Sequence, residues 1–331
     1  MRSLVSLELP TDSADTTAWW LWRKLEVPLS SHQQQTALSP WRGPAMPADH
    51  ETRPLGRTGI RVLPLGIGTN KWRRADRGAV LETYRIIHDA GPCMIDTAEI
   101  YFSERVVGDC LRAGPVGTVI ASKFLPFPGR TSPRRLISAL DGSLARLGLK
   151  TIDLYYVHYP LPLIDVRVFA DGLVEAVKSG KARAVGVANF STEQMRRVAD
   201  HLARAGVRLA ANQVNYSLLR RAAETNGVLA ACRELDVALV AYFPLASGRL
   251  TQPSDGMDAK ALLTCLTEIA RAHDASISQV ALNWLLARDS HVIPIPGATK
   301  PDHARVNLNA LSWRLSGTEF DAIDRASAHG G

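Results

Sequence analysis

The sequence lacks the patterns of a disulfide-rich, metal-binding or membrane-spanning protein. It contains only four cysteines in 331 residues, with no CxxC pair and no cysteine or histidine neighbours at metal-ligand spacing. It has no secretory signal, and no stretch approaches the ~18 uninterrupted apolar residues of a membrane span. We therefore expect a soluble, cytoplasmic protein with reduced thiols, no metal ion and no membrane partner.

Charged residues are also sparse, and the positive ones are not concentrated. They make up 21% of the chain, with a formal net charge of +7. Lysines and arginines are spread through the helical segments and form no tract with interleaved aromatics, so no nucleic-acid partner is predicted. A phosphate-bearing small ligand and a solvated, arginine-rich surface would each account for the excess.

The first 52 residues show no sustained strand or helix period. They contain an aromatic stretch from Trp19 to Trp22. We interpret residues 1–52 as a poorly ordered extension and residues 53–331 as one domain. A native start at Met46, and a docking segment built on the tryptophans, are the alternatives.

From Arg53 onward, short apolar runs alternate with amphipathic segments. This alternation predicts parallel strands joined by crossover helices. The runs interpreted as strands cover residues 62–68, 93–96, 118–122, 153–157, 182–188, 208–212, 237–241 and 291–295. Eight such strands close into a barrel, so we predict an α/β fold of the (β/α)8 TIM-barrel class, with extra C-terminal helices.

Three local patterns support this interpretation. Residues 133–149 and 192–206 carry apolar residues at helical spacing, and Ser191 and Gly206 are suitable start and stop residues for the second helix. Residues 53–63 predict a small hairpin turned at Thr58-Gly59. This hairpin would plug the N-terminal end of the barrel.

Polar residues follow the predicted strands at the point where each strand ends. Successive members are 24 to 35 residues apart, close to the ~30 residues of one βα unit. Because the strands of a parallel barrel all point the same way, these side chains should converge on one mouth. They are Asp96, Lys123, His158, Asn189, Gln213 and Tyr242.

Four residues at this mouth suit proton transfer to a carbonyl oxygen: Asp96, Tyr101, Lys123 and His158. A phenol has an unperturbed pKa of ~10, and a nearby lysine and histidine are expected to lower it. Asp96 would hold the lysine charged. Each residue alone fits a structural role equally well, but together they favour a general acid that works while a hydride reaches the carbonyl carbon.

Ordered motifs in the chain resemble those of the aldo-keto reductase superfamily. They are RPLGRTGIRVLPLGIGT (53–69), DTAEIY (96–101), IASK (120–123), DLYYVH (153–158), VGVANFS (185–191), NQVNYSLL (212–219), AYFPL (241–245) and PIPGATKPDHARVN (294–307). The resemblance covers Arg53 to Asp324. It implies a barrel that reduces aldehydes or ketones with NADPH and uses Tyr101 as the acid.

The resemblance also implies where NADPH binds. Asn189 and Gln213 would hold the carboxamide, Tyr242 would stack on the nicotinamide ring, and a helix start near Thr299 would bind the 2′-phosphate. The implied cofactor residues are Gly68, Thr69, Asn189, Gln213, Tyr242, Leu245, Ser247, Arg249, Gly297, Thr299, Lys300, His303 and Asn307.

The chain departs from the family pattern in several places. Ala188 and Phe243 stand where a Ser is usual, and His303 stands where a Gln or Arg is usual, so NADH remains an alternative cofactor. The loop near residues 251–260 is short, which predicts an open pocket. Only Phe102 separates Tyr101 from Ser103, the expected helix cap, so this loop should be tight, with Phe102 at the pocket rim.

The expected substrate pocket is largely aromatic. Its residues are Trp72, Phe102, Phe124 and Tyr159, with Leu125 and Leu161 nearby. Such a wall favours a medium-sized carbonyl compound over a small charged sugar phosphate. The alternative function is an NADPH-binding regulatory or scaffold subunit with little turnover. The presence of all four catalytic residues, Asp96, Tyr101, Lys123 and His158, favours the enzyme. The sequence does not predict an oligomeric state.

Overall fold

The computed structural model describes residues 51–114, 117–251 and 257–327. Contacts divide the chain into Met1–Ala45 and Met46–Gly331, and every described residue lies in the second unit. The predictions for residues 1–50, and for residues 252–256 of the short loop near residues 251–260, fall outside the described residues.

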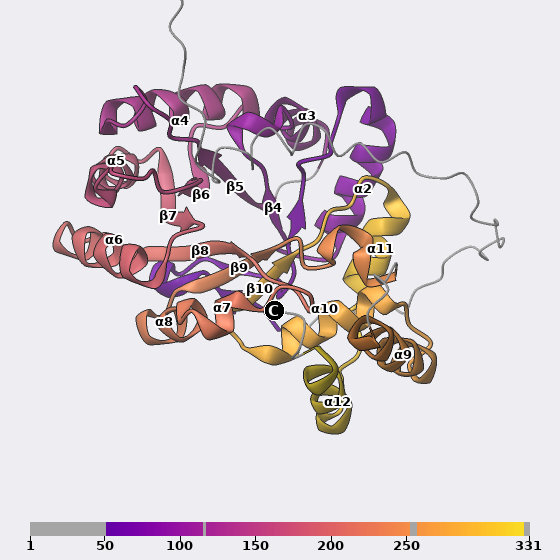
Figure 1. Ribbon diagram of the computed structural model, residues 1–331. Helices are drawn as coiled ribbons and strands as arrows, with labels where there is room; N and C mark the ends of the chain where they lie inside the picture. The colour runs from indigo at the N-terminus through magenta and orange to yellow at the C-terminus, as the bar shows by residue number, and fades with distance from the viewer. Residues whose placement is uncertain (1–50, 115–116, 252–256, 328–331) are drawn as a thin grey trace, which may run out of the picture. The chain divides into compact units, whose positions relative to one another are not determined.

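The main sheet has eight parallel strands in chain order. They are β3 (Ile67–Gly68), β4 (Met94–Asp96), β5 (Val119–Phe124), β6 (Ile152–Val157), β7 (Ala182–Ala188), β8 (Leu209–Asn215), β9 (Ala238–Tyr242) and β10 (Val292–Ile295). The sheet closes because Gly68 and Gly297 form a parallel bridge and the Gly66 N–H donates to the Pro294 carbonyl at 2.9 Å. The predicted (β/α)8 barrel is therefore confirmed (Figure 1).

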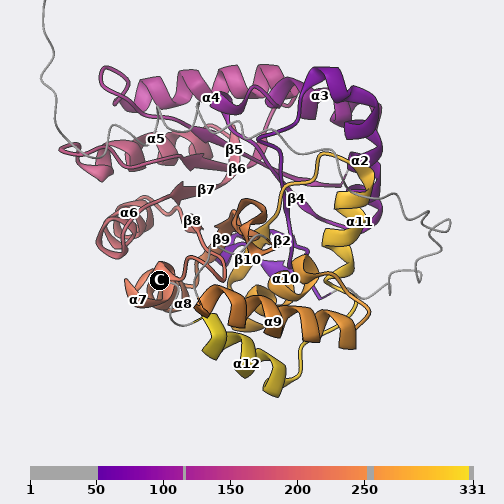
Figure 2. The same ribbon diagram turned by 45° about the vertical axis from the view of Figure 1, so that its right-hand side comes forward.

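Helices surround the strands on the outside (Figure 1). They are α2 (Arg77–Asp89), α3 (Glu104–Ala113), α4 (Pro133–Leu147), α5 (Val166–Lys178), α6 (Thr192–Arg204), α7 (Ala222–Thr225), α8 (Val228–Leu235), α10 (Ile277–Arg288) and α11 (Pro301–Asn309). Two further helices, α9 (Met257–Ala272) and α12 (Gly317–Ser327), pack on each other and on α10 (Figure 2). Within the described ranges, no helix is long and apolar enough to cross a membrane.

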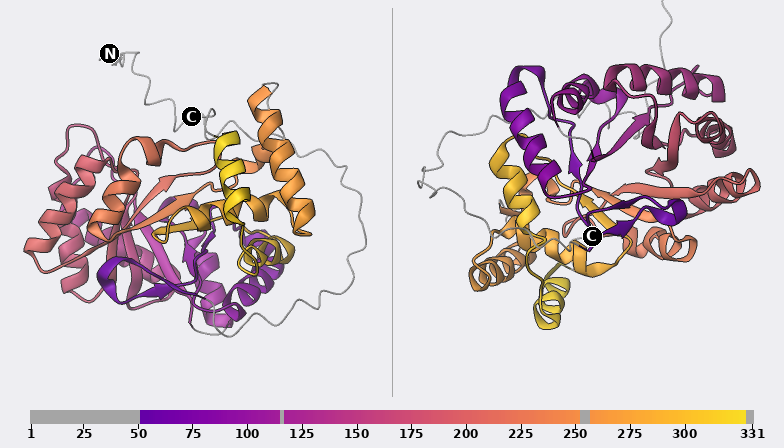
Figure 3. Two further views of the ribbon diagram at one scale, coloured as in Figure 1. Left: turned by 90° about the horizontal axis from the view of Figure 1, so that it is seen from below. Right: turned by 180° about the vertical axis from the view of Figure 1, so that it is seen from behind.

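The predicted hairpin is present. Its strands are β1 (Arg53–Pro54) and β2 (Arg61–Val62), joined through the 3-10 turn η1 (Gly56–Thr58), and Gly59 adopts a φ of 78°. The apolar side chains of Leu55, Ile60 and Val62 pack against the interior side chains of the barrel strands. The hairpin backbone lies across one end of the strands (Figure 3, right). The predicted strand 62–68 is thus divided, because Val62 pairs in the hairpin and only Ile67–Gly68 pairs in the barrel.

Successive side chains of each barrel strand point alternately into the barrel interior and toward the surrounding helices. This alternation decides which side chains reach the mouth. In β5, Val119 and Ala121 face the barrel interior, whereas Ile120 and Phe124 pack in the layer between strands and helices. Lys123 therefore enters the barrel near the C-terminal end of the strand. The same ends of the other strands supply the remaining site residues.

Candidate active site

A buried ion pair forms the base of the site. Lys123 Nζ donates to the Asp96 carboxylate and to the Thr97 carbonyl at 2.8 Å, and the two charged side chains are 0% and 3% exposed. The other carboxylate oxygen accepts from Gln213 Nε2 at 2.8 Å. Burial lowers the pKa of Lys123, an effect that Asp96 opposes. Asp96 therefore links the lysine on β5 to the amide on β8.

Tyr101 lies at the end of the short turn η3 (Glu99–Tyr101), beside this pair. Its hydroxyl is 3.3 Å from His158 Nε2, and Lys123 Nζ lies 5.1 Å from the centre of its ring. Burial, with the nearby Asp96 charge, raises the pKa of Tyr101 well above its usual value. The expected lowering is not found, because burial disfavours the charged tyrosinate and the Asp96 carboxylate repels it. The phenol therefore keeps its proton near neutral pH, as a proton donor must.

His158 is neutral in this setting. It is buried at the end of β6, and burial, followed by the charge of Lys123, lowers its pKa well below the usual value. Its Nδ1 is buried without a hydrogen-bond partner among the described residues, and the Tyr159 ring stacks on it at 5.1 Å. A neutral imidazole can accept from the Tyr101 hydroxyl or donate to a carbonyl oxygen.

The ends of β6, β7 and β9 are joined by a single amide. Asn189 Nδ2 donates to the His158 carbonyl at 3.1 Å, and its Oδ1 accepts from the Tyr242 hydroxyl at 2.9 Å. The second bond holds the Tyr242 hydroxyl at the mouth. In the turn η4 (Ala246–Thr251) that follows, Ser247 and Arg249 are exposed.

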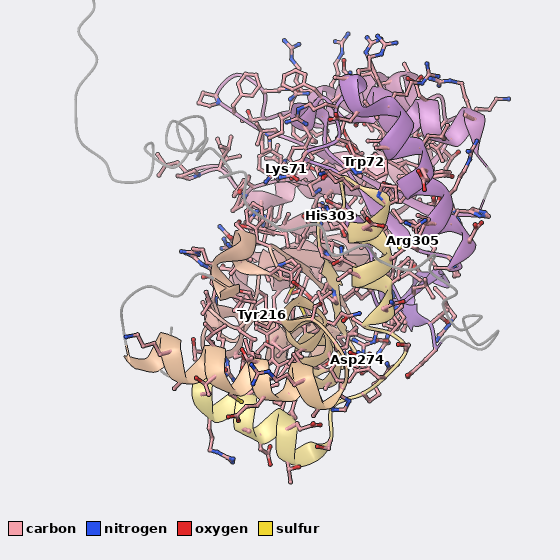
Figure 4. All side chains as sticks on the ribbon, turned by 90° about the vertical axis from the view of Figure 1, so that its right-hand side faces the viewer. Lys71, Trp72, Tyr216, Asp274, His303 and Arg305 are labelled. Atoms are coloured by element: carbon pink, nitrogen blue, oxygen red, sulfur yellow. The ribbon has the colours of Figure 1, made fainter. Side chains whose placement is uncertain are left out.

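The start of α11 lies beside the loop after β3 (Figure 4). Trp72 Nε1 donates to the Ala298 carbonyl at 2.6 Å, and Asn307 Nδ2 donates to the Gly297 carbonyl at 3.3 Å. Pro301 occupies the first turn, and Lys300 is the N-cap residue without a side-chain cap. The first N–H groups of such a helix have no intrahelical partner, and with Lys300 they suit a phosphate.

Four residues lie differently from the sequence expectation. Trp72 and Phe124 are buried in the layer outside the strands, so neither lines the mouth. Thr69 is buried, with Oγ1 donating to the Asp96 carbonyl at 2.9 Å, so it offers no side-chain contact to a cofactor. Ser103 precedes α3 as expected, but its hydroxyl bonds the Thr97 hydroxyl at 2.8 Å and does not cap the helix.

Sequence reasoning also missed an ion pair near the acid. Glu99, two residues before Tyr101, binds Arg130 in the loop after β5 through two hydrogen bonds of 2.6 and 2.7 Å. The residues are 31 positions apart, and no local pattern joins them. Only the charges of the DTAEIY motif and of the loop after the lysine strand could have suggested the pair.

Comparisons with known proteins agree with this geometry. The family model described as the aldo/keto reductase family matches residues 64–328. The 6-dehydroglucose reductase of Novosphingobium aromaticivorans is 33% identical over 84% of this chain and 96% of its own. The chloroplastic pyridoxal reductase of Arabidopsis thaliana is 30% identical over 81% of this chain and 84% of its own.

A solved structure shows the same fold with a cofactor. The crystal structure of an aldo-keto reductase from Klebsiella pneumoniae in complex with NADPH matches with a TM-score of 0.69 and 29% identity, covering 82% of this chain and 94% of that one. The strands, the polar mouth and these matches agree: the chain belongs to the aldo/keto reductase family.

Proposed function

We propose that this chain reduces an aldehyde or ketone to an alcohol with NADPH, and that Tyr101 donates the proton. The observation that carries the proposal is the Tyr101 hydroxyl 3.3 Å from a buried His158, with the Lys123 ammonium 5.1 Å from the ring centre. Reductases among the relatives, and the NADPH-bound neighbour, support the reaction class.

Each of the four proposed catalytic residues has a distinct role. The Tyr101 hydroxyl transfers its proton to the substrate oxygen, and solvent later restores it. Lys123 stabilises the tyrosinate that forms as the proton leaves, because its charge lies against the ring. His158, neutral and next to the phenol, orients the carbonyl oxygen. Asp96 keeps the lysine charged and in place.

The residues at the mouth fit NADPH. When bound, the cofactor supplies the hydride. Asn189 and Gln213 carry amides suited to the carboxamide, and Tyr242 presents an aromatic ring whose hydroxyl donates to Asn189. Lys300 and the uncapped start of α11 suit the 2′-phosphate. Burial and Lys300 lower the pKa of His303, so this residue adds no charge at neutral pH and NADH remains an alternative.

Exposed apolar side chains around the mouth favour a substrate with an apolar body. They occur in the loops after β4, β5, β6 and β9, and we call them the rim: Phe102, Phe127, Tyr159, Leu163 and Phe243. Phe102 and Leu163 are 85% and 105% exposed, and both have a left-handed φ, a costly way to present an apolar side chain to water. The rim continues into the site, because Tyr159 stacks on His158.

The test is a panel of carbonyl compounds assayed with NADPH and with NADH. Oxidation of NADPH with aromatic or branched aldehydes, faster than with sugars or sugar phosphates, supports both reaction and substrate preference. Tyr101→Phe should abolish turnover and keep NADPH affinity within about twofold, because only the proton donor is lost. NADPH binding without turnover on any compound would favour the regulatory alternative.

A further inference from the structure

The Glu99–Arg130 ion pair joins the two loops that carry the acid and the lysine. Glu99 belongs to η3, and Arg130 lies in the loop between β5 and α4. The Arg130 guanidinium donates to both carboxylate oxygens of Glu99, at 2.6 and 2.7 Å. The two side chains are only 11% (Glu99) and 21% (Arg130) exposed. Such a paired, largely buried geometry is more rigid than an ordinary surface ion pair.

Further bonds make this pair the centre of the loop after β5. Glu99 Oε1 also accepts from the Leu125 N–H at 2.6 Å, and Arg130 Nη1 donates to the Leu125 carbonyl at 2.9 Å. The guanidinium lies 4.6 Å from the centre of the Phe124 ring. Arg130 thus folds the loop that follows Lys123, and Glu99 attaches the Tyr101 turn to it.

The Tyr101 turn has few other anchors. Of the residues between Thr97 and Ser103, Ala98, Ile100 and Phe102 carry no polar side chain, and Ile100 and Phe102 are exposed. Apart from Tyr101 itself, Glu99 is therefore the residue whose side chain can hold this turn through polar bonds. The contact from Tyr101 to His158 is already long at 3.3 Å, so a small displacement would break it.

We propose that Glu99 and Arg130 are positioning residues that hold the Tyr101 hydroxyl at His158 and the Tyr101 ring beside the Lys123 ammonium. This inference rests on the proposed function, in which Tyr101 is the proton donor. A misplacement of about 1 Å at a reacting group can cost about 100-fold in rate. Loss of the pair should therefore slow proton transfer and leave the binding of NADPH and of the carbonyl compound nearly unchanged.

The experiment compares Glu99→Gln and Arg130→Lys with a matched control. Glu99→Gln keeps an acceptor for the Leu125 N–H but loses the negative charge. Arg130→Lys keeps the positive charge but loses the two parallel hydrogen bonds of the guanidinium. Both should lower kcat about 10- to 100-fold, change each KM less than about threefold, and increase the solvent deuterium isotope effect on kcat. The double variant should be no slower than the worse single one, because the pair acts as a unit.

The control is Glu234→Gln, which breaks the Arg196–Glu234 pair between α6 and α8. That pair has the same two-bond geometry, at 2.5 and 2.5 Å, and touches none of the site residues named above. A wild-type kcat in this variant would show that losing a two-bond Arg–Glu ion pair elsewhere in the protein does not slow the enzyme. NADPH binding, measured by fluorescence, shows that each variant is folded.

The outcomes separate this inference from the proposed function. Activity that survives Tyr101→Phe would overturn the proton-donor assignment itself. Wild-type kcat and isotope effect in folded Glu99→Gln or Arg130→Lys, with Tyr101→Phe inactive, would overturn only the positioning role. A loss confined to KM, or a loss equal to that of the control, would overturn it as well.

Discussion

Replacing Asp96 by Asn should leave a buried lysine without its counter-ion. Lys123 is 0% exposed, and its remaining hydrogen-bond acceptors, the Thr97 carbonyl and the amide oxygen of the new side chain, are both uncharged. Breaking a buried ion pair typically costs about 3–5 kcal/mol of unfolding free energy. The cost has a ceiling, because the lysine can instead lose its proton on folding.

That ceiling depends on pH. With an unfolded pKa of ~10.4 and about 1.36 kcal/mol per pH unit, deprotonation costs about 4.6 kcal/mol at pH 7 and about 1.9 kcal/mol at pH 9. In the variant the unfolded chain binds one proton more than the native protein, so the free energy of unfolding rises with pH. The gain from pH 7 to pH 9 should approach 2.7 kcal/mol relative to wild type, in which Asp96 keeps the lysine charged.

Urea unfolding of the cofactor-free protein at both pH values measures this difference. The double variant Asp96→Asn, Lys123→Met is the control, since it removes the charge as well as its partner. It should recover most of the lost stability at pH 7 and show no extra pH dependence, yet remain inactive. A loss below about 1 kcal/mol for Asp96→Asn, or an equal loss at both pH values, would refute the assignment of Lys123 as a buried ion-paired cation.

Three further predictions concern the cofactor, the rim and the pH dependence. Lys300→Ala should raise the Kd for NADPH about tenfold and change the Kd for NADH less than about twofold, because only NADPH carries the 2′-phosphate. Equal changes in the two Kd values, measured by fluorescence titration, would contradict the assignment of Lys300 to the 2′-phosphate. Phe102→Gly should raise the free energy of unfolding by about 0.5–1 kcal/mol, since glycine accepts the φ of 59° without strain, and should raise KM for apolar substrates; loss of stability in urea would contradict this. The kcat for reduction should stay flat from about pH 6 to 9, because burial lowers the pKa of His158 and raises that of Tyr101; a steep fall within this range in a buffered steady-state assay would contradict those shifts.

Much of the fold could be predicted because its signals are local. The apolar runs end at turn residues, and Ser191 is the expected N-cap residue of α6, where it forms a capping box with Gln194. A parallel barrel brings strand ends together, so Asp96, Lys123 and His158 could be grouped from the sequence. The division of residues 62–68 was missed, because one apolar run can supply both a hairpin strand and a barrel strand.

The sequence by itself determined the order of the strands and which polar groups follow them, because period-two alternation and turn residues act over a few neighbouring positions. Tertiary structure alone decided which face of each strand points inward, so Lys123 enters the barrel and Phe124 does not. It also decided the partner of Glu99 and the direction of the Tyr101 pKa shift. Burial and ion pairing depend on groups distant in the chain, and only the packed barrel brings them within hydrogen-bond distance.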